Sequence, residues 1–237
     1  MGGEKMRLEY IDAGFVEIID NANIEKIICK YNGACTICFY NKPPKELHVE
    51  CSPYNAQYGM PISEDGSKLF VGSWEKGLYA YSIDSGEVLW KFKPGKIRDI
   101  FVYSKFLIVS RAYTSIVKID IETGGVLGNI NSGTLEHIFS LDAAYVFADT
   151  LSGKHAVINV EEMVVVKKYR SRDVNPHDCL SLMITNVILQ NNIVTICGTE
   201  EYPRRRFDSN ALLSGKNFSR IIDPDFESRA QSTGGAI

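Results

Sequence analysis

The chain has 237 residues, of which 45% are hydrophobic and 23% are charged, as in a globular protein large enough to bury a sizeable core. Its formal net charge of −3 supplies no overall field that would attract nucleic acid or an anionic membrane. No apolar run reaches the roughly 18 residues that a transmembrane helix needs, so neither nucleic acid nor membrane is an expected partner.

The N-terminal segment and the cysteines indicate a compartment. MGGEKMRLEYIDAG lacks the apolar stretch of a secretory signal, which predicts a cytoplasmic protein whose cysteines stay reduced. Cys35 and Cys38 form a CxxC pattern, but two strand residues three apart point to opposite faces, so no metal site is predicted. Cys35 and Cys38 are expected as buried, unreactive thiols. All six cysteines are expected to be reduced, namely Cys29, Cys35, Cys38, Cys51, Cys179 and Cys197.

Strand-like runs recur in sets along the chain. The clearest set is the meander 66–90, with runs at 68–73, 78–83 and 87–92 and with a tight turn at Asp84-Ser85-Gly86. Runs that resemble its first strand begin further sets at 26–31, 106–111, 144–149 and 193–198. A polar residue late in each middle run recurs at spacings of 41, 38 and 39 residues, at Asn41, Ser82, Asp120 and Asn159. Apolar stretches at 97–103 and 135–141 add a fourth, innermost strand. A period of about 40 residues with four strands is typical of a propeller blade.

The repeats predict an all-β fold, a single small β-propeller over residues 6–223 with five blades of four antiparallel strands. The blades are expected at about 8–51, 58–93, 96–130, 134–170 and 178–223. The segment 8–20 is expected to supply the first strand of the first blade or to join the last blade and close the ring. Six blades result if it forms a sheet of its own. The Ser/Gly-rich residues 224–237 are predicted to be a disordered tail.

The best-preserved set carries a recognisable motif. Its motif positions fit the order Ala-x-Asp-x-x-Thr-Gly-x-x-x-Trp, with conservative replacements at two of them, and are Ala80, Ser82, Ser85, Gly86 and Trp90. The next set keeps Asp120, Thr123 and Gly124 but has Gly128 at the tryptophan position. This pattern resembles the pyrroloquinoline-quinone-type (quinoprotein-like) propeller repeat, a relative in shape of WD40 blades.

The resemblance implies roles for these residues. The tryptophan is expected to dock against a neighbouring blade, and the Thr-Gly pair is expected to form the hairpin turn. Cofactor-binding members of the family look like eight-bladed, exported proteins with a calcium site. A five-bladed chain of this kind is therefore expected to have no cofactor.

Two surface segments are candidate contact sites. Residues 200–208 interrupt the fifth set and are predicted to form a solvated loop, because Pro203 and three successive arginines do not suit a central strand. Its candidate contact residues are Tyr202, Arg204, Arg205 and Arg206, whose guanidinium groups suit an acidic protein surface. Tyr54 and Tyr58, in a predicted connection between blades, are a second candidate contact patch because rigid aromatic side chains are good interface anchors.

A third candidate site faces the predicted central channel. His137 lies on an expected innermost strand beside Glu136 and near Asp142, where the three side chains could exchange protons with a substrate. A hydrolase or lyase acting at the channel is therefore one alternative function. A scaffold for several partners is another.

The function that the sequence favours is a non-catalytic binding module with one protein partner. The more specific hypothesis is an inhibitor or immunity protein that binds and neutralises a toxin or an enzyme. No motif for phosphate binding or for nucleophilic catalysis points to a different class.

Overall fold

The computed structural model describes residues 7–11, 14–18, 23–30, 33–50, 60–93, 95–103, 105–131, 135–141, 144–150, 154–170, 186–190, 193–197 and 205–208. Within these ranges, only the backbone is described for 7–18, 135–136, 149–150, 154, 169–170 and 186–208.

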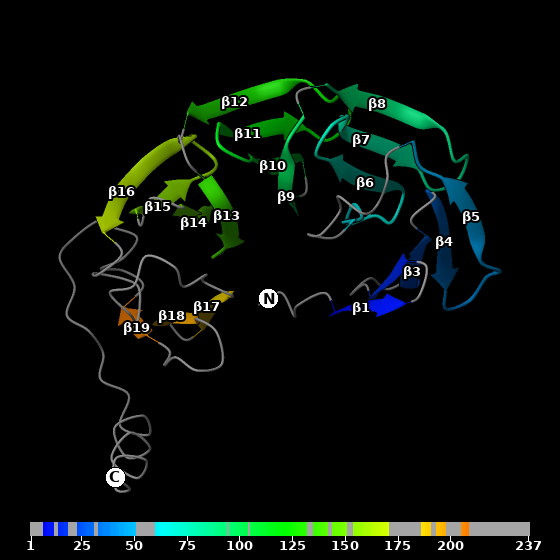
Figure 1. Ribbon diagram of the computed structural model, residues 1–237, viewed down its shortest axis with the longest axis horizontal. Coiled ribbons are helices and arrows are strands. Elements are labelled where there is room, and N and C mark those ends of the chain that lie inside the picture. The colour runs from blue at the N-terminus through cyan, green and yellow to red at the C-terminus, as the bar shows by residue number, and fades with distance from the viewer. Residues whose placement is uncertain are drawn as a thin grey trace, which may run out of the picture. The chain divides into compact units, whose positions relative to one another are not determined.

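The described residues form five antiparallel sheets in which each strand pairs with the next strand along the chain (Figure 1). The first sheet contains β1 (Arg7–Ile11), β2 (Gly14–Ile18), β3 (Ile24–Lys30), β4 (Ala34–Phe39) and β5 (Lys45–His48). The second contains β6 (Lys68–Ser73), β7 (Gly77–Ser82) and β8 (Val88–Phe92). The third contains β9 (Ile97–Val102), β10 (Phe106–Arg111), β11 (Ser115–Asp120) and β12 (Val126–Asn131). The fourth contains β13 (Leu135–Ser140), β14 (Tyr145–Thr150), β15 (Lys154–Asn159) and β16 (Val164–Arg170). The fifth contains β17 (Asn186–Gln190), β18 (Ile193–Cys197) and β19 (Arg205–Asp208).

The polar residue that recurs about every 40 positions accepts hydrogen bonds from a turn in three of these sheets. At the end of β11, the Asp120 carboxylate accepts hydrogen bonds from the backbone N–H groups of Glu122 and Thr123 at 3.0 and 2.8 Å. The Asn159 amide oxygen at the end of β15 and the Ser82 hydroxyl at the end of β7 accept equivalent bonds from residues two or three positions further on. Such bonds satisfy the backbone of a tight turn. Each repeat of about 40 residues in the sequence therefore corresponds to one sheet.

The N-terminal segment differs from the prediction. β1 and β2 pair with each other, and β2 pairs with β3 in a register that sets Val16 opposite Ile28. The segment thus joins the first sheet, which is one of its two predicted placements, but it adds two strands there in place of one. The prediction that it could form a sheet of its own is wrong. In the second sheet, the described residues show the expected fourth strand only as a single bridge between Ile62 and Leu69.

The segment 200–208 also differs in its described part. The predicted loop is wrong for β19, which pairs along β18 with Phe207 opposite Val194. Among the described residues, β19 is the edge strand of its sheet, and an edge strand tolerates the charges that a central strand does not. Residues 200–204, which include Pro203, lie outside the described residues.

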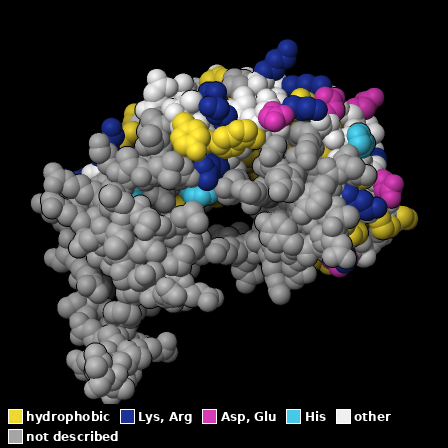
Figure 2. Space-filling model, viewed as in Figure 1, with side chains coloured by type: hydrophobic (Ala, Val, Ile, Leu, Met, Phe, Trp, Pro, Cys, Tyr) yellow, Lys and Arg dark blue, Asp and Glu magenta, His cyan; other side chains and the backbone are white. Residues whose placement is uncertain are grey.

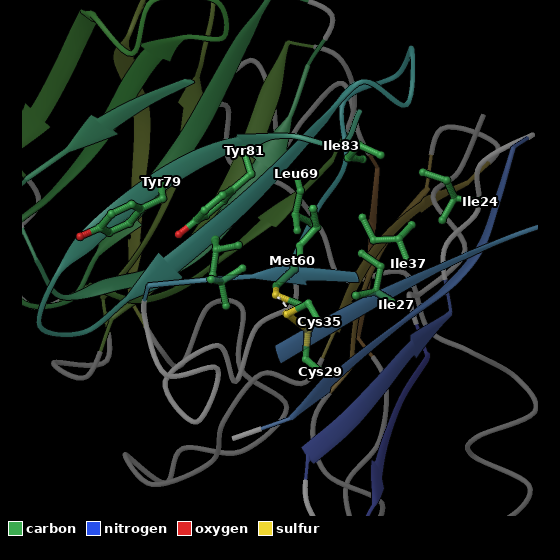
Figure 3. Close-up of a cluster of buried hydrophobic side chains, with 13 residues drawn as sticks. Ile24, Ile27, Cys29, Cys35, Ile37, Met60, Leu69, Tyr79, Tyr81 and Ile83 are labelled. Carbon is green, nitrogen blue, oxygen red and sulfur yellow. Dashed lines mark hydrogen bonds between the residues drawn. A yellow bond between two sulfur atoms is a disulfide. The ribbon is translucent and has the colours of Figure 1, made fainter. Parts of the chain in front are cut away.

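The second sheet is buried on both faces. Because strand side chains alternate between faces, Leu69 on β6 and Tyr81 on β7 pack against the first sheet, whereas Phe70 and Ala80 pack against the third. Coverage on two sides explains why β6 and β7 read as nearly continuous apolar runs. Figure 3 shows the first of these cores, in which Ile24, Ile27 and Ile37 of the first sheet join residues of β6 and β7.

The cysteine prediction needs a correction. Cys29 on β3 and Cys35 on β4 are register partners with Cα atoms 4.3 Å apart, and they form a disulfide (Figure 3). Met60 lies beside it, 3.6 Å from the sulfur of Cys29. The prediction of reduced thiols relied on compartment alone and missed this pairing across a hairpin. Cys38 is a free thiol, partly exposed.

The chain divides into two compact units, Gly3–His137 and Ile138–Ile237 with Gly2, so that the boundary falls within β13. The first three sheets lie in the first unit. In the second unit, the fourth sheet buries the middle of β14 and β15, with Val146, Phe147, Val157 and Ile158 nearly inaccessible to solvent. No helix among the described residues is long and apolar enough to cross a membrane.

Candidate functional site

Two exposed aromatic side chains touch across neighbouring sheets of the first unit. Trp74 follows β6 and is 38% exposed, and Tyr113 follows β10 and is 47% exposed. Their ring centroids lie 6.2 Å apart with planes at 87°, an edge-to-face arrangement. Trp74 lies in the turn between β6 and β7, and Tyr113 lies in the corresponding turn between β10 and β11. Together they form an aromatic pair. We call the surface around this pair, formed by residues 73–77, 93, 95–96 and 111–115, the rim.

Backbone hydrogen bonds tie the two turns together. The segment between β8 and β9 runs between them, and the Lys96 N–H donates to the carbonyl oxygen of Trp74 at 2.6 Å. The carbonyl oxygen of Lys96 in turn accepts a 2.8 Å bond from the Ala112 N–H. Gly95 lets the chains approach, because a Cβ there would lie 2.7 Å from the Trp74 carbonyl oxygen. The rim is thus a connected structure rather than two independent turns.

The same rim holds two strained residues. Lys96 and Tyr113 have φ angles of 64° and 62°, in the left-handed region that side-chain-bearing residues rarely adopt. Each such residue costs on the order of 1 kcal/mol or more and persists only where its surroundings enforce it. The Lys96 ammonium lies 5.8 Å from the centroid of the Tyr113 ring, within range of a cation–π contact. The exposed side chains are therefore held in place before any partner binds.

Sequence reasoning missed this rim, although a signal was present. In the sequence, residues 74–77 look like an ordinary polar turn between two strand runs. An aromatic residue recurs in the corresponding turn of three successive repeats, at Tyr31, Trp74 and Tyr113. Tyr31 lies outside the described residues, so the structure shows two of the three.

The predicted channel histidine has a carboxylate neighbour that was not predicted. The Nδ1 atom of His137 lies 3.5 Å from a carboxylate oxygen of Asp99, and both side chains are largely buried. Such a neighbour can hold an imidazole in one orientation and one tautomer. The Glu136 side chain and Asp142 lie outside the described residues. Asp99 could have been found by alignment, since it is the third residue of β9 as His137 is the third residue of β13.

The other predicted contact residues are only partly placed. The backbones of Arg205 and Arg206 lie in β19, where they pair with Ile196 and Thr195. The remaining predicted contact residues lie outside the described residues, namely Tyr54, Tyr58, Tyr202 and Arg204. Within the described part of the chain, no group of three or more His, Cys, Asp or Glu side chains could hold a metal ion.

The motif residues build the scaffold beneath the rim. Trp90 and Ala80 are buried between the second and third sheets. Gly86 and Gly124 take φ angles of 81° and 71° in their turns, and Thr123 donates its hydroxyl to Asp120 at 2.8 Å. The bonds that Thr123 donates are the main cause of a lowered pKa for Asp120. This is the architectural use that the repeat resemblance implies.

Comparison with known proteins identifies the fold. No protein-family model matches the sequence, and no curated protein matches it. The structure matches the crystal structure of BamB from Moraxella catarrhalis with a TM-score of 0.63 at 13% sequence identity. The match covers 91% of this chain and 62% of that chain, so this chain spans less than two thirds of the length of BamB.

At this identity the likeness shows the fold alone. The structure matches 1202 solved chains, and a fold shared so widely does not specify a function. BamB is a β-propeller of PQQ-like repeats, the repeat type to which the segment around Trp90 is similar. The predicted resemblance is therefore confirmed: the fold of this chain is that of the PQQ-type β-propellers.

Proposed function

We propose that this chain is a non-catalytic, protein-binding β-propeller and that the rim around Trp74 and Tyr113 is its contact surface. The observation that carries the proposal is the exposed aromatic pair, held by hydrogen bonds between two sheets and by two left-handed residues. Trp and Tyr are enriched among the residues that dominate binding energy at protein interfaces. A surface that is already ordered loses little conformational entropy on binding.

We also propose that each sheet is one blade, which makes five blades with the N-terminal strands in the first. The five sheets of the described residues and the period of about 40 residues support this number.

The more specific proposal concerns the partner. In it, the partner is a toxin or an enzyme that the propeller neutralises by covering its surface. A rigid rim suits this role, because a blocking contact needs high affinity without a conformational change.

Site-specific photo-cross-linking tests the surface. A photoreactive phenylalanine analogue at position 113, expressed in the native cell, should capture one protein in a fixed ratio to this chain. The matched control is the same analogue at Tyr40, which is 58% exposed and lies in the turn after β4, away from the rim. Equal capture at positions 113 and 40 would reject the rim as the contact surface.

A binding assay with the captured protein completes the test. Trp74→Ala and Tyr113→Ala should each weaken binding by tenfold or more, as expected for loss of an interface anchor worth about 2 kcal/mol. Tyr40→Ala should leave the affinity unchanged. If the captured protein has a toxic or enzymatic activity, one equivalent of this chain should abolish it, and undiminished activity in the complex would reject neutralisation.

A second candidate function rests on the His137–Asp99 pair. In a hydrolase or lyase, His137 would act as the proton-transferring group and Asp99 would orient it. His137→Gln should then abolish turnover of a small molecule while the rim still captures its partner. If His137→Gln abolishes the turnover of no small molecule, the pair has a structural role.

A further inference from the structure

Charges around the aromatic pair differ in sign from the rest of the chain. The described residues of the rim are 73–77, 93, 95–96 and 111–115. They include four basic residues, Lys76, Lys93, Lys96 and Arg111, against one acidic residue, Glu75. The rim is thus basic, whereas the chain as a whole has a net charge of −3.

An acidic residue that contacts the rim from outside these segments, Glu50, is already engaged. The Glu50 carboxylate forms a salt bridge with Lys91 at 2.9 Å, and its main-chain oxygen accepts a hydrogen bond from the Lys76 ammonium. Arg111 is half-buried and donates to Gly95 and Ser115. These contacts hold two of the rim cations against the protein.

Lys93 and Lys96 are different. Both side chains are exposed, and among the described residues no carboxylate forms an ion pair with either of them. Lys96 also projects over the Tyr113 ring from a backbone held in the left-handed region. The rim therefore presents exposed positive charge beside an exposed apolar surface. On the face shown in Figure 2, Lys and Arg side chains adjoin hydrophobic ones in the described part.

We infer that the partner of this rim is an acidic protein segment, one that places an apolar side chain against Trp74 and Tyr113 and carboxylates beside Lys93 and Lys96. The inference rests on the proposed binding function and adds the chemistry of the partner to it. Charge complementarity of this kind steers association and excludes partners of the wrong sign. The aromatic pair supplies the apolar anchor site.

Designed peptides test this chemistry directly. The probes are three 15-residue peptides with the same central Leu-Phe pair, flanked by Glu and Asp, by Lys, or by Gln. The readout is the indole N–H signal of Trp74 in a nitrogen-15 spectrum, assigned by its loss in Trp74→Phe. The acidic peptide should shift this signal at 0.05 M salt and should bind about tenfold more weakly at 0.5 M salt, because salt screens exposed charges. A basic or neutral peptide that binds as tightly as the acidic one would overturn the inference, as would the absence of any shift.

A charge-reversal pair supplies the matched control. Lys93→Glu with Lys96→Glu should weaken binding of the acidic peptide about tenfold or more, since two attractions become repulsions. Lys42→Glu with Lys105→Glu makes the same change in net charge at exposed residues outside the rim. Lys42 lies after the end of β4, and Lys105 lies just before the start of β10. This pair of changes should alter binding less than twofold. Equal weakening by both pairs would overturn the inference.

The same variants separate this inference from the proposed function. If position 113 still captures its partner selectively in the variant with Lys93→Glu and Lys96→Glu, the rim remains the contact surface but the partner is not acidic. Capture that does not exceed the Tyr40 control rejects the surface itself.

Discussion

The indole nitrogen of Trp90 on β8 donates a 3.1 Å hydrogen bond to the carbonyl oxygen of Ile121, the residue after β11. The bond joins the second sheet to the third, and the ring lies 5.9 Å from that of Phe70 in their shared core. Gly124, in the turn after Ile121, lies directly against the indole. One repeat thus carries the tryptophan, and the next supplies its hydrogen-bond acceptor and the space for its ring.

Removing this ring should strongly destabilise the protein. Trp90→Ala should lower the free energy of unfolding by about 3–5 kcal/mol, because it leaves a large cavity between two sheets. Trp90→Phe should cost less, about 1–3 kcal/mol, mainly from the unpaired carbonyl of Ile121. Urea unfolding measures both values. Trp74→Ala is the control, with an expected cost of about 1 kcal/mol for a partly exposed aromatic contact. Equal costs for the two alanine variants would show that Trp90 does not join the sheets.

The glycine beneath the indole should tolerate no side chain. A Cβ at Gly124 would lie 2.7 Å from Trp90 Cδ2, and the residue has a φ of 71°. Gly124→Ala should therefore cost about 2 kcal/mol or more from steric overlap and backbone strain. At Gly125 a Cβ would meet only the Thr123 hydroxyl at 3.2 Å, so Gly125→Ala should cost about 0.5 kcal/mol. Similar unfolding midpoints for the two variants would contradict this packing.

Asp65 should make stability depend on acid pH. A hydrogen bond from the Ser63 hydroxyl, with bonds from the backbone and hydroxyl of Ser67, lowers the pKa of Asp65 to about 2 from its usual 3.8. A carboxyl whose pKa is lower in the folded state stabilises the fold above its unfolded pKa, and this contribution is lost as pH falls from about 4 to about 2.

Unfolding in urea across this pH range tests the Asp65 prediction. Asp65→Asn should be less stable than the natural chain near neutral pH, and the difference should shrink between pH 4 and pH 2. Glu64→Gln changes the adjacent carboxylate, which accepts none of these hydrogen bonds, and should leave that part of the profile unchanged. A gap between Asp65→Asn and the natural chain that is constant with pH would show that titration of Asp65 is not its cause.

The disulfide predicts a labelling pattern. Alkylation of the unfolded chain without reductant should modify Cys38 but not Cys29 or Cys35, and reduction should expose those two as well. Intact mass spectrometry counts the labels. The same labelling in the native cell bears on localisation, since disulfides persist mainly in oxidising compartments whereas the N-terminal sequence predicts the cytoplasm. Six labels without reductant would restore the prediction of free thiols.

The sequence alone determined the repeat and most strand positions. β6 and β10 fall at the predicted 68–73 and 106–111, because alternating apolar runs between turn residues are local signals. The motif around Trp90 also indicated the PQQ-type propeller repeat that the structural match confirms. Turn chemistry at Ser82 and Asp120 follows from residue type and spacing, with no need for distant contacts.

The tertiary structure alone decided which residues from different strands and turns are neighbours. The Cys29–Cys35 disulfide, the His137–Asp99 pair and the contact between Trp74 and Tyr113 join residues on different strands or in different turns. No local pattern states the register of a hairpin or the packing of one sheet on the next. Exposure of Trp74 likewise depends on what its neighbours leave uncovered, so a turn that reads as ordinary in the sequence becomes the candidate contact surface only in the folded protein.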